Sequence, residues 1–427
     1  MNIQELYALF CTASGVTSDS RKINQNQLFF ALRGENFNGN SFAQRALELG
    51  AAYSIIDEPE YQTNEKCILV DDVLTTLQQL ANYHLHQIRP KTILAITGSN
   101  GKTTTKELVH AVLSTTYNTH YTKGNYNNHI GIPLTLLEMP ANTDIAVIEM
   151  GANHQKEIEQ YCTYVEPTHG IITNCGKAHL EGFGGEVGVR KGKGELYDYL
   201  AQHDGTVFVN GDDGILIEML KERKLEHIIR YGKNTSNKYQ GKIIQEQPFL
   251  KIQFEDVIIQ SNLFGSYNYT NIMCAVAVGK SFNVKNEQIK QAIENYFPNN
   301  ARSQMIEKGD YKLILDAYNA NPTSMQHALE SLAQSATKNK IVILGDMFEL
   351  GEYAAQEHQK IVDLASSLRF NTIVLVGEEF AKTNHSSEIL VFADTTKAQQ
   401  WFKQQQFQDA VILLKGSRSM KMEKVIE

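Results

Sequence analysis

The sequence is poor in cysteine, and its few cysteines form no paired motif. The 427 residues include five cysteines, at positions 11, 67, 162, 175 and 274, and no two are arranged as Cys-x-x-Cys. An odd number of scattered cysteines gives neither a disulfide framework nor a cysteine metal site. We therefore expect reduced thiols, as in a cytoplasmic protein.

The sequence also lacks long apolar runs and an excess of positive charge. No apolar run approaches the length of a membrane span, and no basic stretch precedes an apolar one at the N-terminus, so we expect neither membrane insertion nor a signal peptide. The formal net charge of -8 argues against a general binder of nucleic acid or of anionic membranes. We expect a cytoplasmic monomer that holds any anionic ligand through local groups.

The most informative stretch is a glycine loop at residues 97–105. An apolar run at 92–96 predicts a buried strand before it, and apolar residues spaced three and four apart from 108 to 113 predict a helix after it. Strand, glycine loop and helix in this order are typical of a phosphate-binding loop, where backbone N–H groups and a helix N-terminus attract anionic oxygens. The loop is a short Gly-x-x-Gly-Lys-Thr form, because Ile96 stands where the longer form has glycine. The alternative is a chance glycine turn before a helix.

The residue types in this loop suit a nucleotide and a metal ion. Gly101 allows close backbone approach, Lys102 supplies a charge for the outer phosphates, and the hydroxyl of Thr103 can ligate Mg2+. The predicted nucleotide-binding residues of the loop are Gly98, Ser99, Asn100, Gly101, Lys102, Thr103 and Thr104.

Polar residues also follow two further predicted strands. The run at 144–149 predicts a buried strand ending in Glu149, where a second Mg2+ anchor belongs; a solvated carboxylate is the alternative. The strand predicted from 170 leads to His179, for which a metal role and an ordinary surface histidine are both open. A basic cluster around Lys193 is either phosphate-facing or solvated.

The N-terminal segment has no nucleotide loop of its own. Ser20, Arg21 and Arg33 can contact a phosphate-bearing ligand, and a solvated surface with two ordinary arginines is an equal alternative. Farther along, the asparagine-rich stretch with Asn125 and Asn127 suits a binding loop, or else a plain connection.

Three local structural predictions complete this part of the chain. Ser41 is expected to cap a helix that carries Phe42 on one face. The alternating residues at 225–262 predict antiparallel strands beside the parallel sheet. Asn268 and Asn271 are three apart and are expected to share one helix face.

The last segment alternates strand-like and helical stretches. Four apolar runs, each ending at Gly, Asp or Lys, predict a doubly wound domain, with functional loops at the carboxyl ends of its strands. The loop after Asp316 is the strongest of these. We therefore expect an α/β fold with three domains: a small α/β N-terminal domain (1–85), a central P-loop ATPase-like domain with a mostly parallel sheet (86–300), and a C-terminal Rossmann-like, doubly wound domain (301–427).

Together these stretches resemble the Mur ligase family, the ATP-dependent amino-acid ligases of peptidoglycan synthesis, over essentially the whole chain. The shared motifs are TGSNGKTT at 97–104, Glu149-Met150-Gly151, Ala178-His179, Lys193-Gly194-Glu195, Asn268, Asn271, Arg302 and the strand end at Asp316. Within the family, the stretches at 124–128, 179–184, 318–325 and 344–351 resemble most the members that add D-alanyl-D-alanine.

The resemblance implies specific partners and roles. It implies that the N-terminal domain binds the UDP part of UDP-N-acetylmuramoyl-tripeptide, the central domain ATP and Mg2+, and the C-terminal domain D-alanyl-D-alanine. Thr103 and Glu149 would ligate one Mg2+, His179 would help to hold a second, and Lys193 matches a lysine that becomes carbamylated. The expected catalytic residues are Lys102, Glu149, His179 and Lys193. Those expected around the nucleotide are Asn268, Asn271, Arg302 and Asp316. Those expected at the substrates are Ser20, Arg21, Arg33, Asn125, Asn127, Asn128, Tyr318, Asn319 and Asn321.

The sequence departs from the family pattern at two places, and two rival functions remain. Tyr267 stands where a histidine often precedes the first asparagine, and residues 38–40 read Asn-Gly-Asn instead of the commoner Asp-Gly-His. One rival is a sister ligase that adds a single amino acid. The other is a P-loop regulatory ATPase, which would leave Lys193, His179 and the third domain without a role.

Overall fold

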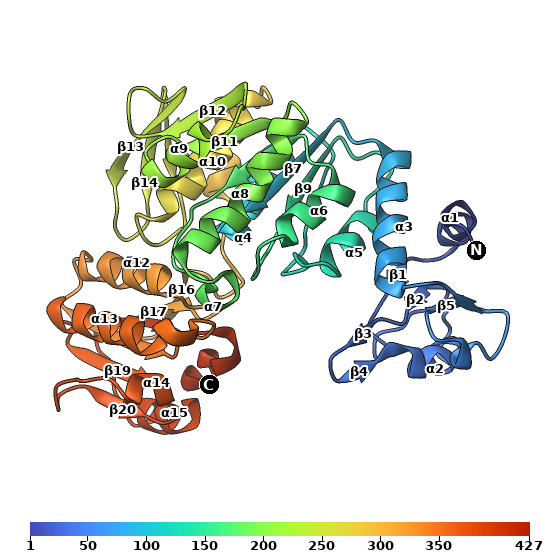
Figure 1. The fold of residues 1–427 in the computed structure, drawn as a ribbon. Helices are drawn as coiled ribbons and strands as arrows, with labels where there is room; N and C mark the ends of the chain where they lie inside the picture. Colours follow the sequence, from blue (N-terminus) through green and yellow to red (C-terminus); the bar gives the residue numbers. More distant parts are fainter. The chain divides into compact units, whose positions relative to one another are not determined.

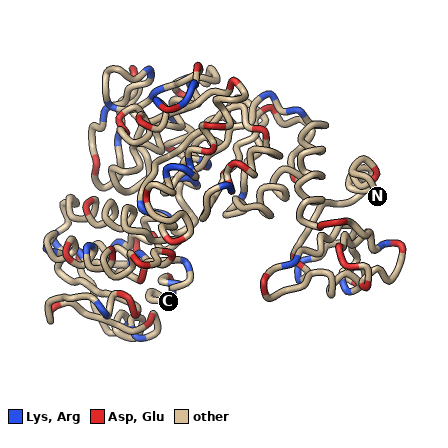
Figure 2. The backbone as a smooth tube through the Cα atoms, in the orientation of Figure 1, with Lys and Arg blue, Asp and Glu red and all other residues tan.

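The computed structural model describes residues 1–427, which fold into two compact units (Figure 1). The first unit comprises residues 1–95, 117–151 and 157–169; the second comprises 96–116, 152–156 and 170–427. Two strands, β7 (Thr92–Thr97) and β10 (His169–Ile172), begin in the first unit and end in the second. No helix combines the length and the apolar character needed to cross a membrane. Acidic and basic residues are interspersed along both units (Figure 2).

The N-terminal part of the first unit is built on a small parallel sheet. Its strand order is β1-β2-β5-β6, formed by β1 (Val16–Thr17), β2 (Leu28–Phe30), β5 (Tyr53–Ile56) and β6 (Cys67–Leu69). A hairpin of β3 (Arg33–Gly34) and β4 (Phe37–Asn38) follows β2, and the helices here are α1 (Ile3–Thr12) and α2 (Ala43–Glu48). Strand β2 is buried throughout, as its continuous apolar run predicts.

The predicted cap at Ser41 is wrong. The turn before α2 is instead capped by Asn38, whose side chain accepts a hydrogen bond from the backbone N–H of Asn40, and α2 begins at Ala43 without a side-chain cap. The hydroxyl of Ser41 donates to the carbonyl of Asn38 at 2.8 Å. Asn38 takes the capping role because its side chain closes a local turn on the backbone N–H two residues on.

The rest of the first unit is organised around α3 (Val73–Ile88). Asp72 caps this helix and Arg89, in the left-handed conformation at φ 51°, ends it. The helix runs across residue 85, where the sequence analysis places a domain boundary. It packs against α1, α5 (Gly131–Leu137) and α6 (Glu157–Val165), and nearby β8 (Thr119–Tyr121) pairs in parallel with β9 (Ile145–Glu149).

The second unit begins with the elements around the glycine loop. The helix predicted after the loop is α4 (Lys102–Leu113), and its four expected apolar residues are all buried, which confirms the helical pattern. It packs against α10 (Asn268–Ser281) and α11 (Asn286–Glu294). Two helices follow β10 along the chain, namely α7 (Leu180–Phe183) and α8 (Glu186–Gln202).

The next strands of the second unit correct one prediction. They are β11 (Thr206–Asn210), β12 (His227–Gly232), β13 (Tyr239–Gln245), β14 (Lys251–Phe254) and β15 (Val257–Gln260). Strands β13, β14 and β15 are antiparallel as predicted, whereas β12 pairs in parallel with β11 and with β13. The β11–β12 pair is parallel because the connection through α9 (Gly214–Lys221) returns the chain to the end of the sheet at which β11 began.

The C-terminal part of the second unit is the expected doubly wound domain. Its six-stranded sheet has the order β16-β17-β21-β18-β19-β20, and only β16 is antiparallel to its neighbour. These strands are β16 (Gln304–Lys308), β17 (Tyr311–Asp316), β18 (Asn339–Gly345), β19 (Thr372–Val376), β20 (Leu390–Phe392) and β21 (Ala410–Lys415). The helices are α12 (Pro322–Ala333), α13 (Ala354–Ser367), α14 (Glu378–Ala381) and α15 (Thr395–Lys403). The four predicted strands are thus confirmed, and their carboxyl ends carry the loop after Asp316.

Candidate active site

The glycine loop joins the end of β7 to the start of α4, and two of its glycines are required by conformation and by space. Gly98 has φ 137° and Gly101 has φ 79°. A Cβ atom at Gly98 would lie 2.0 Å from Oγ1 of Thr173, and one at Gly101 would lie 2.6 Å from Oδ1 of Asn271. Side chains are therefore disfavoured at both positions, and glycine lets the loop pack closely against Thr173 and Asn271.

Replacing Gly98 with alanine tests this packing. We expect Gly98→Ala to lower the free energy of unfolding by roughly 2–4 kcal/mol, because the added methyl group meets Thr173 in a backbone conformation that L-residues avoid. Thermal melting would measure the loss. Gly214→Ala is the matched control, since Gly214 has no neighbour within 4 Å of an added Cβ. Equal melting temperatures for the two variants would contradict the prediction.

The loop is held in place by the segment that follows β10. The backbone N–H of Asn100 donates to Oδ1 of Asn174 at 3.0 Å, and the hydroxyl of Ser99 donates to the carbonyl of Gly176 at 2.9 Å. The ammonium of Lys102 donates to the carbonyls of Gly98 and Ser99, at 2.7 and 3.2 Å. A fixed loop with a positive charge and a helix N-terminus is a preorganised site for phosphate.

The asparagine pair on α10 braces this loop. Asn271 donates to Oδ1 of Asn268 at 2.8 Å, so the prediction that they share one helix face is confirmed. Oδ1 of Asn271 also accepts from the hydroxyl of Thr105 on α4 at 3.1 Å. Both asparagines are buried. Direct contact with a nucleotide stays a prediction for both.

His179 and Lys193 lie on neighbouring elements of the second unit. His179 precedes α7 in the left-handed conformation, and its Nδ1 lies 2.5 Å from a carboxylate oxygen of Glu349. This close approach of His179 lowers the pKa of Glu349. Lys193 on α8 is fully buried, donates to the carbonyl of Ala152 at 3.0 Å and lies 4.8 Å from the ring centre of Phe183. Of the two alternatives that the sequence left open for the cluster around Lys193, the structure excludes a solvated Lys193 side chain.

Glu149 belongs to the first unit, where it ends β9. Its side chain is buried, and its carboxylate accepts a hydrogen bond from Nδ2 of Asn127 at 2.7 Å. Its backbone N–H donates to the hydroxyl of Thr122 at 3.0 Å. Asn127 therefore orients this carboxylate, while Oδ1 of Asn128 accepts from the N–H of Gly131, the first residue of α5, at 2.8 Å. Contact of either asparagine with a substrate stays a prediction, and only the structure reveals these two local roles.

Removing the Asn127 amide is expected to destabilise the first unit. In Asn127→Ala a buried carboxylate loses one charge-assisted hydrogen bond, so we expect the free energy of unfolding to fall by about 1.5–3 kcal/mol. Chemical denaturation would measure it. Asn125→Ala is the control, because the Asn125 side chain is exposed. A loss of equal size in the control would show that the Glu149 contact is not the cause.

The C-terminal domain contributes an arginine, an aspartate and a lysine. The guanidinium carbon of Arg302 lies 3.6 Å from the ring centre of Tyr318. Asp316, at the end of β17, accepts a hydrogen bond from the ammonium of Lys415 at 2.6 Å. Lys415 is buried and also donates to the carbonyl of Asn319 at 3.0 Å. The sequence analysis missed Lys415, whose only signal is its position at the end of a strand, where a lysine is often merely solvated.

Asn321 connects this domain to the glycine loop. Its Nδ2 donates to Oδ1 of Asn100 at 2.7 Å, across 221 residues of sequence. Its own Oδ1 accepts from the N–H of Ser324 at 2.9 Å and so caps α12. Nearby, the N–H of Lys177 donates to the hydroxyl of Thr323 at 3.0 Å. These contacts place the loop after Asp316 directly beside the glycine loop and the segment that follows β10.

The arginines of the N-terminal segment are ion-paired within the segment. Arg21 donates to both carboxylate oxygens of Asp19, at 2.8 and 3.0 Å, and this hydrogen bonding lowers the pKa of Asp19 to about 2. Arg33 lies 3.3 Å from Asp57 and 3.4 Å from Glu58. Both guanidinium groups are at least half exposed, so a ligand can still reach them, but their charge is partly compensated. Substrate contacts by Ser20, Arg21 and Arg33 stay predictions.

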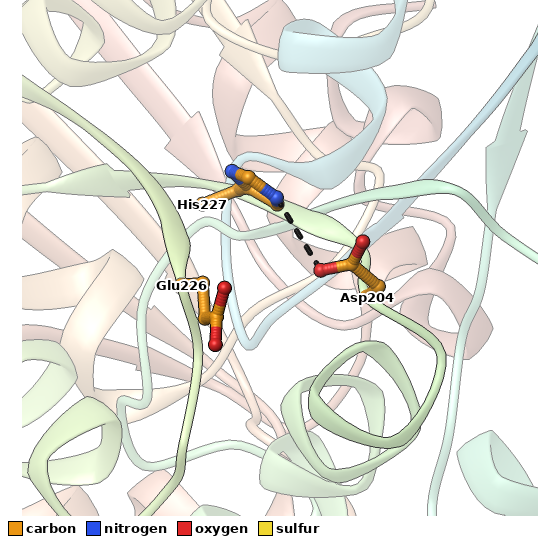
Figure 3. A group of neighbouring side chains, drawn as sticks. All are labelled: Asp204, Glu226 and His227. Atoms are coloured by element: carbon orange, nitrogen blue, oxygen red, sulfur yellow. Dashed lines mark ion pairs between the residues drawn. The ribbon is translucent and has the colours of Figure 1, made fainter.

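Three further side chains of the second unit form a group of potential metal ligands. Asp204, Glu226 and His227 gather near the starts of β11 and β12, with Nε2 of His227 at 3.3 Å from Oδ1 of Asp204 (Figure 3). All three side chains are exposed. Exposed pairs of this kind are common on protein surfaces and contribute little to stability, so we assign no metal to them.

The sequence of this chain is similar to known proteins over nearly its whole length. Three family models match in succession: the Mur ligase family, catalytic domain, at residues 12–85; the Mur ligase middle domain at 96–279; and the Mur ligase, glutamate ligase domain, at 301–418. The UDP-N-acetylmuramoyl-tripeptide--D-alanyl-D-alanine ligase of Bacillus subtilis is 35% identical over 97% of this chain and 92% of its own length. The ligase of the same name from Escherichia coli is 33% identical over 99% and 95%.

Solved structures show the same similarity. MurF from Acinetobacter baumannii superimposes with a TM-score of 0.87 at 29% identity, covering 100% of this chain and 97% of that chain. The MurF ligase from Thermotoga maritima, solved in complex with ADP, gives a TM-score of 0.85 at 24% identity, covering 98% and 97%. The architecture of three Mur ligase domains, predicted from the sequence, is therefore confirmed as the fold.

Proposed function

The chain belongs to the Mur ligase family, and we propose that it joins D-alanyl-D-alanine to UDP-N-acetylmuramoyl-tripeptide at the expense of ATP, for peptidoglycan synthesis. The observation that carries this function is the extent of the similarity: it covers nearly the full length of curated ligases of this one specificity. The phosphate loop and the adjoining C-terminal loop at Asn321 supply the geometry that such a reaction needs.

The chemistry follows from the need to activate a carboxylate. An oxygen of the tripeptide's terminal carboxylate attacks the γ-phosphorus of ATP, ADP leaves, and an acyl phosphate forms. The amine of D-alanyl-D-alanine then attacks the acyl carbon, phosphate leaves, and the nitrogen loses a proton. Lys102 and the N–H groups of the glycine loop stabilise charge during phosphoryl transfer. Contacts such as Asn100–Asn321 keep the C-terminal domain beside the loop and so help to exclude water from the acyl phosphate.

The side chains present suit Mg2+, which would neutralise phosphate charge when bound. We propose Mg2+-binding roles for the hydroxyl of Thr103, the carboxylate of Glu149 and the imidazole of His179. The oxygen donors fit this hard cation, and the buried Glu149 carboxylate is already oriented by Asn127. Lys193 fits a cation site only as a carbamate, since an ammonium group repels a metal ion; its complete burial supports a role other than solvation.

The domain roles and the location are part of the same proposal. We propose boundaries at 1–85, 86–300 and 301–427, supported by the three successive family matches, although α3 continues past residue 85 to Ile88. The first domain would bind the UDP moiety and the third the dipeptide. A cytoplasmic location is supported by the ATP requirement and by the five free cysteines.

Phosphate release from ATP in the presence of UDP-N-acetylmuramoyl-tripeptide tests the function. Release that requires D-alanyl-D-alanine as well, with one pentapeptide formed per phosphate, is expected. Release with a single amino acid but not with the dipeptide would identify a sister ligase. Steady hydrolysis that is indifferent to both substrates would overturn the ligase assignment.

A further inference from the structure

The linker that carries Arg302 has an unusual backbone. Ala301 has φ 54° and Ser303 has φ 51°, so both neighbours of Arg302 are in the left-handed region although neither is glycine. Such conformations are costly for L-residues and persist where surrounding contacts enforce them. Because one such residue stands on each side of Arg302, we infer that the surrounding contacts fix the direction in which the Arg302 side chain leaves the backbone.

The contacts that enforce this backbone come from two sides, the loop at the end of β17 and Tyr267. The N–H of Ser303 donates to Oδ1 of Asp316 at 3.0 Å, and the carbonyl of Ala301 accepts from the N–H of Tyr318 at 3.2 Å. The hydroxyl of Ser303 shares a hydrogen bond with the hydroxyl of Tyr267, with the oxygens 2.6 Å apart. Ser303 itself is buried. The contacts with Asp316 and Tyr318 lie within the C-terminal domain. Of these three contacts, only the one with Tyr267 comes from the central domain.

Arg302 is left with its charge available. Its guanidinium carbon lies over the ring of Tyr318, its buried Nε has no hydrogen-bond partner, and it forms no ion pair with a carboxylate. The nearby carboxylate of Asp316 is already bound by the ammonium of Lys415 at 2.6 Å. A guanidinium oriented by an aromatic ring and not neutralised by an acid is suited to an anionic oxygen.

Tyr267 connects this linker to the phosphate loop. It directly precedes α10. On this helix, Asn271 accepts a hydrogen bond from the hydroxyl of Thr105 and lies next to Gly101 of the glycine loop. Burial, reinforced by the Asp316 carboxylate, raises the pKa of Tyr267 well above its usual value, so the hydroxyl remains protonated as a hydrogen-bonding group. On the side of the C-terminal domain, its ring faces His327 of α12 at 6.2 Å.

We propose that Tyr267 is a positioning residue for Arg302: its hydroxyl, through Ser303, fixes the left-handed linker and so aims the Arg302 guanidinium at the phosphates of the nucleotide. The inference rests on the proposed function, because the nucleotide is the ATP of that reaction. Tyr267 does not touch the nucleotide in this scheme; it acts only through the linker.

Tyr267→Phe removes the hydroxyl and leaves the ring in place. We expect the dissociation constant for ATP and the KM for ATP to rise on the order of 5- to 10-fold, the value of one lost hydrogen bond, with an unchanged KM for D-alanyl-D-alanine. Tyr269→Phe is the matched control: its hydroxyl, on the same helix, donates to the carbonyl of Gly241 at 2.6 Å, away from the linker. This control should leave both constants for ATP unchanged.

A double-mutant cycle with Arg302→Ala decides whether the effect passes through the arginine. In the Arg302→Ala background, Tyr267→Phe should have no further effect on ATP binding, whereas a general loss of packing would add to it. Ser303→Ala should reproduce Tyr267→Phe, and the two should not add. Unchanged ATP binding in Tyr267→Phe, or an effect of equal size with and without Arg302, would overturn the proposal.

Titration of ATP alone separates this proposal from the proposed function. ATP binding is measured without the other two substrates, so it does not depend on the ligase reaction. A failure to form pentapeptide would refute the ligase function. The double-mutant cycle on ATP affinity would still support or refute the role of Tyr267. Normal pentapeptide formation together with unaltered ATP affinity in Tyr267→Phe would refute the positioning role alone.

Discussion

Replacing Lys102 with methionine is expected to lower the rate of pentapeptide formation on the order of 10³-fold, the largest loss among the side chains of the phosphate loop. The ammonium is the single full positive charge in the loop at 97–104, and it already lies against the carbonyls of Gly98 and Ser99. Phosphoryl transfer depends mainly on positioning and on charge stabilisation. Methionine keeps most of the length of the side chain but not its charge, so the substitution removes the main electrostatic contribution of the loop.

The loss should appear in kcat more than in the affinity for the dipeptide. Phosphate release and product formation would fall together, and the melting temperature should change little because Lys102 is only half-buried. Lys91→Met is the control, since the Lys91 side chain is 82% exposed and pairs only with Asp144 at 3.5 Å. A Lys102→Met protein that keeps more than about a tenth of the rate would contradict a direct role in phosphoryl transfer.

Replacing Lys193 with alanine is expected to lower activity by at least about 10²-fold, because a metal site would lose an oxygen ligand. The carbamate proposal makes a further prediction that simple loss of packing does not. Short carboxylic acids such as acetate should restore part of the activity, since their carboxylate can enter the space left by the lysine and supply the missing oxygen atoms. Activity of the unaltered protein should likewise fall in buffer stripped of carbon dioxide and recover on addition of bicarbonate.

The control for this experiment lies two residues away on the same helix. Lys191 is exposed on α8, so Lys191→Ala should keep its activity and should not respond to acetate. Activity of Lys193→Ala that is lost and cannot be restored by any short acid, in a protein with an unchanged melting curve, would show that Lys193 acts as an amine and not as a carbamate.

Two local predictions from the sequence failed, one at a helix cap and one at a strand pairing. Ser41 is a good capping residue by type, but Asn38 closes the turn first. The alternating pattern at 225–262 indicates strands correctly, yet the direction of β12 depends on the crossover through α9 and not on alternation. Polarity patterns report which face of a strand is buried and carry no information on the neighbour with which it pairs.

The sequence by itself determined the glycine loop between a strand and a helix, the doubly wound third domain and the family. These features are encoded locally, in glycine spacing, apolar periodicity and contiguous motifs, so they survive without knowledge of contacts. The glycine pattern at 98 and 101 shows this best, because both positions need a backbone that only glycine adopts freely.

Only the tertiary structure decided what the polar side chains of the site do. Asn127 orients Glu149, Asn321 joins the phosphate loop, Lys415 holds Asp316, and Tyr267 reaches Ser303. Three of these four contacts join residues more than 30 positions apart, and the fourth joins residues 22 apart. A polar side chain can donate to any acceptor within about 3 Å, and sequence does not specify which acceptor folding brings to that distance. The residue types therefore predicted the chemistry, and long-range packing assigned the partners.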